Sequence, residues 1–509
     1  MTEAYLSVLL LIFPLWIGVG GYQRMTETKY ALFRWSAVIY LGLMLLLLLE
    51  LSLVGKSREV MAALRPFSVT QVCIAGYIAC CGLSALLSDY RSEVWRGAGR
   101  YEGLETILLY AALFFMISRF GKFKKRHLWL LGAAVLINAA IGVMQYAGQN
   151  PFALFPAGYT YHDAFVRYSG AFMGTLGNVD LLSAFLSLTV PLFYACYVTH
   201  EKSAAFLVPF TAGVFLLLLS GVSAGVVGIA AGLLATFPFL ASTKHGFTRV
   251  LLSGAAAAVG AAAYSCLSFT YENSVTALFF RPGPPAAALL LLAALLSAAA
   301  AYIDRGKSKV WDSRRAKKAL TGAVLGAVAI ALAVLWAYPF SEGVLSEAHQ
   351  LLRGNVSPEF GSSRIKIWQE SWKLLPGHLF FGGGPDTLAN RMTFSFTRYI
   401  EAIGVTVNSY IDNAHNDYLN ILVNTGLFSL LFYLGALASA AVRAAQSSDE
   451  ERNIPVMATA LLCYLVQIFF SFSLCIVSPF FWAFLGLLEA SLLEMRTRRC
   501  LKKCVSTKN

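Results

Sequence analysis

The chain has 509 residues, of which 58% are hydrophobic and 13% are charged, and its formal net charge is +13. Soluble domains carry charge on about a quarter of their residues, so this composition excludes an ordinary soluble protein. Apolar runs recur from end to end, and each has the roughly 17–25 residues that a helix needs to cross a bilayer. The sequence therefore predicts an all-α polytopic bundle in a lipid bilayer, with residues 1–509 forming a single integral membrane domain.

The apolar runs predict about 12–14 membrane spans. Their approximate limits, in chain order, are 4–22, 30–55, 69–88, 104–120, 128–147, 179–198, 204–221, 223–242, 250–268, 285–303, 320–338, 418–442, 456–475 and 479–495. The first run has no basic leader and no small-residue cleavage site, so we interpret it as a span rather than a signal peptide. The nine cysteines follow no metal-binding spacing, and most lie inside spans as small buried hydrophobes.

Lysine and arginine indicate the orientation. If the N-terminus lies in the cytoplasm, 26 of the 40 basic residues fall in cytoplasmic loops or the C-terminal tail and 13 in outer loops. This bias follows the positive-inside rule and explains the basic charge without a nucleic-acid partner. Both termini are then cytoplasmic, and two large loops, 149–178 and 339–417, face outside. The second is too long and polar for a simple turn, so we expect it to carry part of a functional site.

Three polar segments come just before spans that begin at the outer surface: Arg100–Leu104, Arg167–Asn178 and His415-Asn416. A helix N-terminus carries a partial positive charge and unpaired N–H groups, which favour anions, and asparagine at 178 suits an N-cap. Arginine binds phosphate through paired donors. Together with Arg364 in the large loop, these segments predict an outward-facing anion site. The alternative is that each arginine only contacts lipid headgroups.

His415 is the candidate base. It shares a helical stripe with Leu419 and Gly426, so it should face the bundle rather than lipid. A helix N-terminus disfavours the imidazolium ion and keeps the ring neutral, able to accept a proton. Two alternatives stay open: a histidine that only caps or hydrogen-bonds, and a metal ligand acting with Asp412 and Asp417.

Within the large loop, apolar residues recur at near-helical spacing at Ile365, Trp368, Trp372 and Leu375. This pattern predicts a short amphipathic helix on the membrane surface with tryptophan at the headgroup level. A helix that merely packs on the bundle fits the pattern as well.

At these residues the sequence resembles the superfamily of O-antigen ligases and O-antigen polymerases, bacterial envelope glycosyltransferases. The family pattern is His-(Asn/Ser/Gln), nine residues, Gly, two residues, then Gly, Thr or Tyr. Here His415-Asn416 and Gly426 match it, and Ser429 departs from it. The other similar segments are Arg364 and Trp368 ahead of Gly382–Pro385, Arg167 to Asn178, and Arg100–Leu104. The turn 220–225 lacks the family's Ser-Arg-Gly, and 176–179 lacks its Asn-Pro-Asn.

The resemblance implies a GT-C-like bundle in the bacterial cytoplasmic membrane with its active site outside. It implies a metal-independent enzyme without a cofactor, acting in cell-surface polysaccharide synthesis. The donor would be an undecaprenyl-diphosphate-linked glycan, and the acceptor a hydroxyl of a glycan, lipid or protein. The catalytic residue would be His415. The substrate-binding residues would be Arg100, Arg167, Arg364, Asn178, Asn416 and Trp368. Whether the enzyme is a ligase or a polymerase stays open.

A transporter or flippase of lipid-linked oligosaccharide is the alternative. Such a protein should have broken helices or charged residues near the middle of the bilayer. Here the spans are almost free of charge and the polar groups collect on one side, which favours chemistry at one face.

Overall fold

The computed structural model describes residues 1–64, 67–155, 172–270, 285–305, 312–341, 343–400, 405–447 and 450–506. The described chain is an all-α bundle, and nine of its helices are long and apolar enough to cross a membrane. Helices are the expected solution because each satisfies its own backbone hydrogen bonds where no water is present. The predicted all-α polytopic fold is confirmed.

Each of the fourteen predicted spans corresponds to a helical segment. The bounds are Thr2–Leu15 (which includes α1 and α2), α3 Met25–Leu51, α5 Val69–Leu87, α6 Leu104–Phe120, α7 Lys125–Tyr146, α9 Val179–Thr199, α10 Leu207–Leu219, α11 Ser223–Leu240, α12 Lys244–Thr270, α13 Ala286–Arg305, α14 Ser313–Ala337, α18 Asp417–Ser447, α19 Asn453–Gln467 and α20 Ser478–Ser506. A further helix, α4 (Ser57–Leu64), follows α3.

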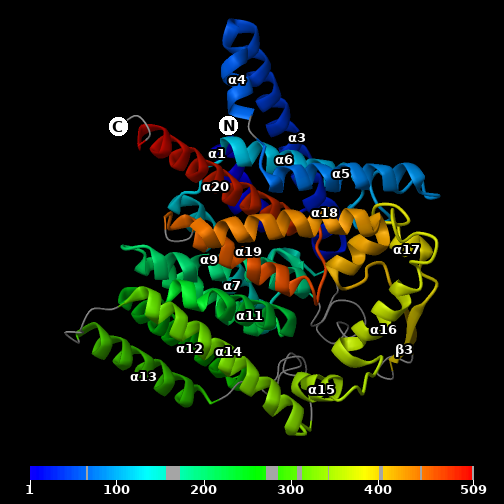
Figure 1. The fold of residues 1–509 in the computed structure, drawn as a ribbon. Helices are drawn as coiled ribbons and strands as arrows, with labels where there is room; N and C mark the ends of the chain where they lie inside the picture. Colours follow the sequence, from blue (N-terminus) through cyan, green and yellow to red (C-terminus); the bar gives the residue numbers. More distant parts are fainter. Residues whose placement is uncertain are drawn as a thin grey trace.

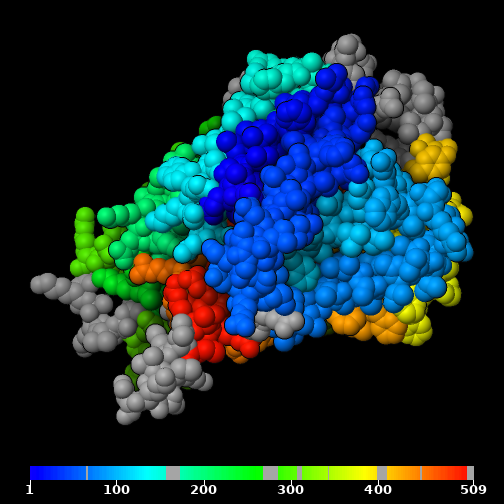
Figure 2. Space-filling model, turned by 90° about the horizontal axis from the view of Figure 1, so that it is seen from above, coloured from blue at the N-terminus to red at the C-terminus, as the bar shows by residue number. Residues whose placement is uncertain are grey.

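Helix α9 is the core of the bundle, since its apolar span is buried over its full length. It packs against α10, α11, α12 and α19. At the edge, α14 has no buried residue, as expected for a helix whose apolar side chains face lipid. Figure 1 shows α12, α13 and α14 together on one side of the bundle, with α18, α19 and α20 farther up. Figure 2 shows the N-terminal helices, in blue, covering another face beside the end of α20, in red.

The loop 339–417 folds at one end of the bundle. It contains α15 (Gly343–Leu352), α16 (Phe360–Trp372), α17 (Leu388–Arg391) and an antiparallel hairpin of β3 (Ser395–Ile400) and β4 (Val405–Tyr410). In Figure 1 these elements lie on the right, whereas both chain ends lie toward the upper left. A second, two-residue pair, β1 (Phe172–Met173) with β2 (Gly177–Asn178), leads directly into α9.

The predicted short helix is present as α16, and it ends before Leu375. Ile367 is buried, and the Trp368 ring packs against Phe469 with centroids 5.8 Å apart. Trp372 points away, with 61% of its surface exposed. One face of α16 thus packs on the bundle, as the second interpretation had it, while Trp372 remains on the outer surface of the loop.

Helix α18 is broken where a glycine turn crosses it. Gly426 has φ 88° and ψ 174°, and the segment 379–384 hydrogen-bonds to the backbone exposed by this break. Gly384 N donates to Asn424 O at 2.8 Å, and Leu427 N donates to Leu379 O at 2.8 Å. The backbones are so close that a Cβ on Gly426 would lie 2.2 Å from the Phe380 carbonyl oxygen. The glycine turn at 382–384 and Gly426 of the histidine motif therefore pack together as one structural unit.

Two predicted spans are too long. The first helical segment ends at Leu15 rather than 22, ahead of the glycines at 18, 20 and 21. Helix α19 ends at Gln467 rather than 475, and residues 468–477 form a mostly buried loop. That loop is apolar, so hydropathy alone extends the span through it. Its backbone is instead bonded to α18, since Asp417 N donates to Ile468 O at 3.0 Å.

Candidate active site

Arg100 joins three loops at the end of the bundle that carries residues 339–417. Its Nε and Nη2 donate to the two carboxylate oxygens of Asp412 at 2.7 and 2.6 Å. Its guanidinium lies over the Phe472 ring, 4.4 Å from the centroid. Burial would raise the pKa of Asp412, but the Arg100 charge and hydrogen bonds outweigh this and hold the pKa below its usual value. The carboxylate is therefore ionised and fixed, although 42% of the side chain is exposed.

Arg364 follows three residues with left-handed backbone, Gly361, Ser362 and Ser363. One guanidinium nitrogen, Nη1, donates to Gly361 O at 3.1 Å. Another, Nη2, lies 3.6 Å from Oδ1 of Asp180 in the first turn of α9. This distance is longer than that of a good charged hydrogen bond, so Arg364 is held more loosely than Arg100.

Two buried hydrogen-bond donors near the Arg364–Asp180 pair have no partner among the described residues. The Nε atom of Arg364 and the Nε1 atom of Trp368, one helical turn farther along α16, are buried without a hydrogen bond among the described residues. Buried donors are nearly always paired in folded proteins. These two unpaired donors lie on the same helix, beside positively charged side chains. They suit a binding site in which a ligand supplies the hydrogen-bond acceptors.

His415 lies outside helix α18 rather than on it. Its φ of 49° places it in the left-handed region, and its backbone N–H donates to Asn413 Oδ1 at 2.9 Å. The half-buried ring meets Phe472 edge-on, with centroids 5.0 Å apart. The predicted helical stripe is therefore wrong for His415, because the turn before the helix and Phe472 set its direction.

The electrostatics of His415 favour a neutral ring. Burial lowers its pKa most, the charges of Arg100 and Arg364 lower it further, and Asp412 opposes them, so that the pKa falls to about 4. Within the described part of the chain, the hydrogen bond of His415 is made by its backbone N–H and none by its ring nitrogens. At neutral pH the imidazole can therefore accept a proton.

The two predicted asparagines cap helices. Asn178 Oδ1 accepts from Asp180 N at 2.7 Å at the start of α9, and Asn416 Oδ1 accepts from Leu419 N at 3.0 Å at the start of α18. Their oxygens thus stabilise the helix ends that border the site, and binding of substrate through their amide nitrogens stays a prediction. Arg167 lies outside the described residues.

The partners of Asp412 and Asp417 give no support to the alternative in which both bind a metal together with His415. Asp412 binds Arg100, and Asp417 Oδ1 accepts from Ser473 N at 3.3 Å, so both carboxylates already have partners within the protein. Over the described ranges there is no group of three His, Cys, Asp or Glu side chains that could hold an ion.

One protein family matches part of the chain. Residues 285–434 match the family described as O-Antigen ligase. This stretch is similar to an O-antigen ligase, and residues 285–434 are called the matched region below. The match includes Arg364, Trp368, His415 and Asn416, and it supports membership of the O-antigen ligase and polymerase superfamily and a role in polysaccharide synthesis at a membrane. A comparison with curated proteins found no match.

Three residues that complete the site lie outside the matched region, residues 285–434: Arg100, Asp180 and Phe472. The sequence singled out Arg100, but it gave no signal for its partners. Asp180 is an ordinary first-turn carboxylate, and Phe472 was placed inside a span. Only the tertiary fold shows that the segment before α6, the first turn of α9 and the loop after α19 meet the matched region here.

A polar cavity of about 70 Å³ lies next to this site, among α5, α6, α18 and α20, and sequence reasoning missed it. Glu102, Asp386 and Asp417 line it. Asp386 is only 8% exposed, and burial raises its pKa to about 7. Burial also raises the pKa of Glu102 well above its ordinary value, against the hydrogen bond from Tyr110 at 2.8 Å. A signal was available, since Glu102 adjoins the Arg100 motif and Asp386 follows the glycine turn.

Proposed function

We propose that the protein is a glycosyltransferase that moves a glycan from an undecaprenyl-diphosphate-linked donor to an acceptor hydroxyl. One observation carries the proposal: Arg100 and Arg364 lie close enough to His415 to lower its pKa, and both Arg364 and His415 lie within the residues that match the O-antigen ligase family. Positive charge beside a neutral base is what transfer from a diphosphate requires.

The diphosphate is already a good leaving group, so it needs charge stabilisation more than a proton. Arg364 suits this role because its ion pair with Asp180 is loose and its Nε is unused. Trp368 Nε1 adds a second donor for a phosphate or glycan oxygen. Arg100 is already held by Asp412 at both oxygens, so its proposed part is to fix the site and supply charge. Arg167 would add a further cation.

In the proposed step His415 accepts the proton of the acceptor hydroxyl. The acceptor oxygen forms a bond to the anomeric carbon, the bond from that carbon to the diphosphate oxygen breaks, and undecaprenyl diphosphate leaves with the electron pair. The step uses no metal and no cofactor.

The proposed setting is the bacterial cytoplasmic membrane, with both termini in the cytoplasm and the site facing outside. The distribution of lysine and arginine supports this orientation. Residues 339–417 would then be a large extracytoplasmic loop within one integral membrane domain, contributing Arg364, Trp368 and His415.

A transporter or flippase of lipid-linked oligosaccharide is the second candidate, and one observation favours it. The break of α18 at Gly426 is of the kind that transporters use at binding sites. Here, however, the glycine turn packs into the break and pairs with its backbone, and the charged residues gather at one helix end. Purified protein in lipid vesicles that consumes the donor without an ion gradient would exclude this candidate.

The test is release of undecaprenyl diphosphate in vesicles that contain donor and acceptor. We expect His415→Ala to lower the rate by about 10²–10⁴-fold, the usual contribution of a general base. The matched control is His378→Ala, in the same loop but with an exposed side chain, and it should retain full activity. Thermal unfolding checks that both variants are folded. A folded His415→Ala variant with full transfer activity would overturn the proposed role.

A further inference from the structure

At the opposite end of the bundle, a basic cavity adjoins an apolar pocket. The cavity, of about 720 Å³, lies where α9 and α11 end and where α14 and α19 begin. The pocket, of about 220 Å³, lies deeper among α11, α18, α19 and α20. Phe239, Leu240 and Pro455 line both spaces, so they form the boundary between them. Neither space contains a residue of the proposed transferase site.

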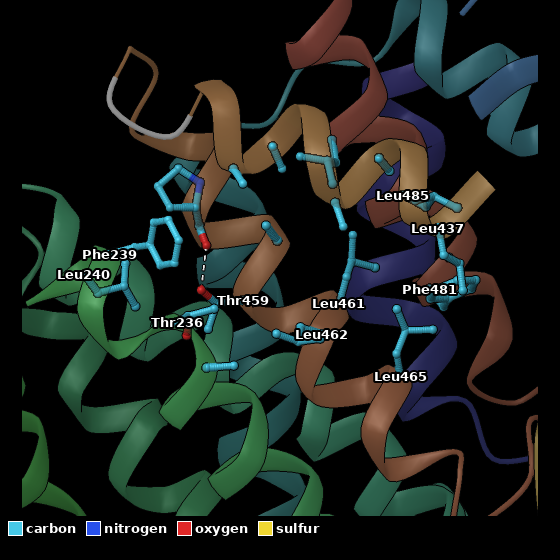
Figure 3. A pocket seen from close by; sticks show the side chains of 18 residues that line it. Thr236, Phe239, Leu240, Leu437, Thr459, Leu461, Leu462, Leu465, Phe481 and Leu485 are labelled. Carbon is cyan, nitrogen blue, oxygen red and sulfur yellow. Dashed lines mark hydrogen bonds between the residues drawn. The ribbon is translucent and has the colours of Figure 1, made fainter. Parts of the chain in front are cut away.

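The pocket offers a ligand nothing but apolar contact. Its two polar side chains already bond within their own helices: Thr459 Oγ1 donates to Pro455 O at 2.7 Å, and Thr236 Oγ1 donates to Gly232 O at 2.9 Å. Figure 3 shows Phe239 and Leu240 at one end of the pocket and Phe481 and Leu485 at the other, with Leu461 and Leu462 between them. Such a space suits a hydrocarbon chain entering from the Phe239 end.

The cavity has an excess of positive charge. Arg314, Lys317 and Arg452 line it, against the single carboxylate of Glu201. Glu201 is engaged with Arg452 at 3.7 Å, which leaves the charges of Arg314 and Lys317 without an ion pair among the described residues. Lys317 Nζ lies 4.0 Å from the centre of the Phe239 ring, so one of these charges is located at the boundary with the apolar pocket. His245 is the remaining titratable side chain of the lining.

We propose that these two spaces together bind one anionic glycerophospholipid of the adjoining leaflet. Its phosphate lies in the cavity against Arg314 and Lys317, and one acyl chain runs past Phe239 into the apolar pocket. Charge complementarity selects an anionic headgroup, and the pocket selects a lipid over a soluble phosphate. The bound lipid contacts α11 and α19, and it joins them to α14, which otherwise has no buried residue.

Native mass spectrometry of the purified full-length protein tests the headgroup. We expect phosphatidylglycerol to be retained in preference to phosphatidylcholine. Arg314→Gln combined with Lys317→Gln should weaken phosphatidylglycerol binding about 25-fold, at about fivefold for each basic side chain. The matched control is Arg315→Gln, because Arg315 is 90% exposed and pairs with Asp312. Equal retention of the two lipids, or no loss in the double variant, would overturn the proposal.

A photoactivatable acyl chain on phosphatidylglycerol tests the pocket in the unmodified protein, where folding is not in question. We expect crosslinks in the peptides that contain 437–445 and 455–465. Crosslinks confined to residues outside α11, α18, α19 and α20, the helices that line the pocket, would contradict the assignment. Glycerol phosphate binding as tightly as the lipid would indicate a soluble phosphate ligand, and preferential retention of a polyprenyl phosphate would indicate a carrier lipid. Either result would overturn the choice of a glycerophospholipid.

Discussion

Replacing Gly426 by alanine should destabilise the protein strongly, because two separate costs fall on that position. Its φ of 88° and ψ of 174° lie in a region that only glycine occupies readily, and holding another residue there costs about 1–3 kcal/mol. The new Cβ would also lie 2.2 Å from the oxygen and 2.4 Å from the carbon of the Phe380 carbonyl. Neither atom belongs to a flexible side chain, so the glycine turn itself would have to move.

Moving that turn would disturb its hydrogen bonds with α18. Leu427 N donates to Leu379 O at 2.8 Å and Phe428 N to Phe380 O at 3.4 Å, and each such bond contributes about 1 kcal/mol. Together with the backbone term, we expect a loss of roughly 3–5 kcal/mol. Proteins are commonly stable by only about 5–15 kcal/mol, so the loss should be evident as a lower apparent Tm in nanodiscs, followed by tryptophan fluorescence.

Gly435→Ala is the matched control on the same helix. A Cβ at Gly435 would meet only the Cys73 sulfur, at 3.4 Å, and alanine is better than glycine in a helix by roughly 0.5–1 kcal/mol. We expect its Tm to stay unchanged or rise. If Gly426→Ala unfolds at the temperature of the unmodified protein, the glycine turn does not pack into the break of α18 as described.

Three further outcomes are expected. Asp412→Asn should lower the rate of transfer, because Arg100 loses the opposite charge and one of its two acceptor oxygens. It should cost no more than about 1 kcal/mol of stability, since the pair is partly exposed; rate and Tm are measured together. The raised pKa of Asp386, about 7, means that the folded protein keeps a proton that the unfolded chain loses near pH 4, so stability should fall as pH rises from about 4 to 7. Asp386→Asn should remove up to about 4 kcal/mol of that dependence, read from Tm at pH 4 and 7.5. In the same variant, kcat/KM should not fall with decreasing pH until His415 is protonated near pH 4. A decrease in kcat/KM centred near pH 6.5 would contradict the burial of His415.

The helices could be predicted from the sequence because a chain in hydrocarbon must satisfy its own backbone. Hydropathy failed where apolar residues are buried without being helical. The loop at 468–477 is the clearest case: its Phe and Leu residues resemble a span, but its backbone is bonded to the start of α18. The break at Gly426 could not be predicted either, because one glycine inside an apolar run does not indicate that another segment crosses the helix there.

The candidate site was predictable as a set of residues but not as a set of pairs. Arginines and a histidine before helix starts indicated which side chains to examine. Nothing in the spacing indicated that Arg100 binds a carboxylate 312 positions away or that Arg364 faces the first turn of α9. Such partners are chosen by the packing of distant helices. The left-handed conformation of His415 likewise has no local signal, since histidine accepts it only in a particular turn.

The pairing of the arginines bears on when the proposed base becomes active. With Asp412 and Asp180 opposite Arg100 and Arg364, the charges nearly balance, and burial dominates the low pKa of His415. A pKa of about 4 makes imidazole a weak base near neutral pH, where a pKa close to the working pH is best. A diphosphate bound at Arg364 would bring negative charge near the ring and raise its pKa. We therefore expect the donor to bind before the acceptor is deprotonated. NMR titration of labelled histidine should give a higher pKa for His415 with a non-reactive donor analogue bound, and an unchanged pKa would place the diphosphate away from His415.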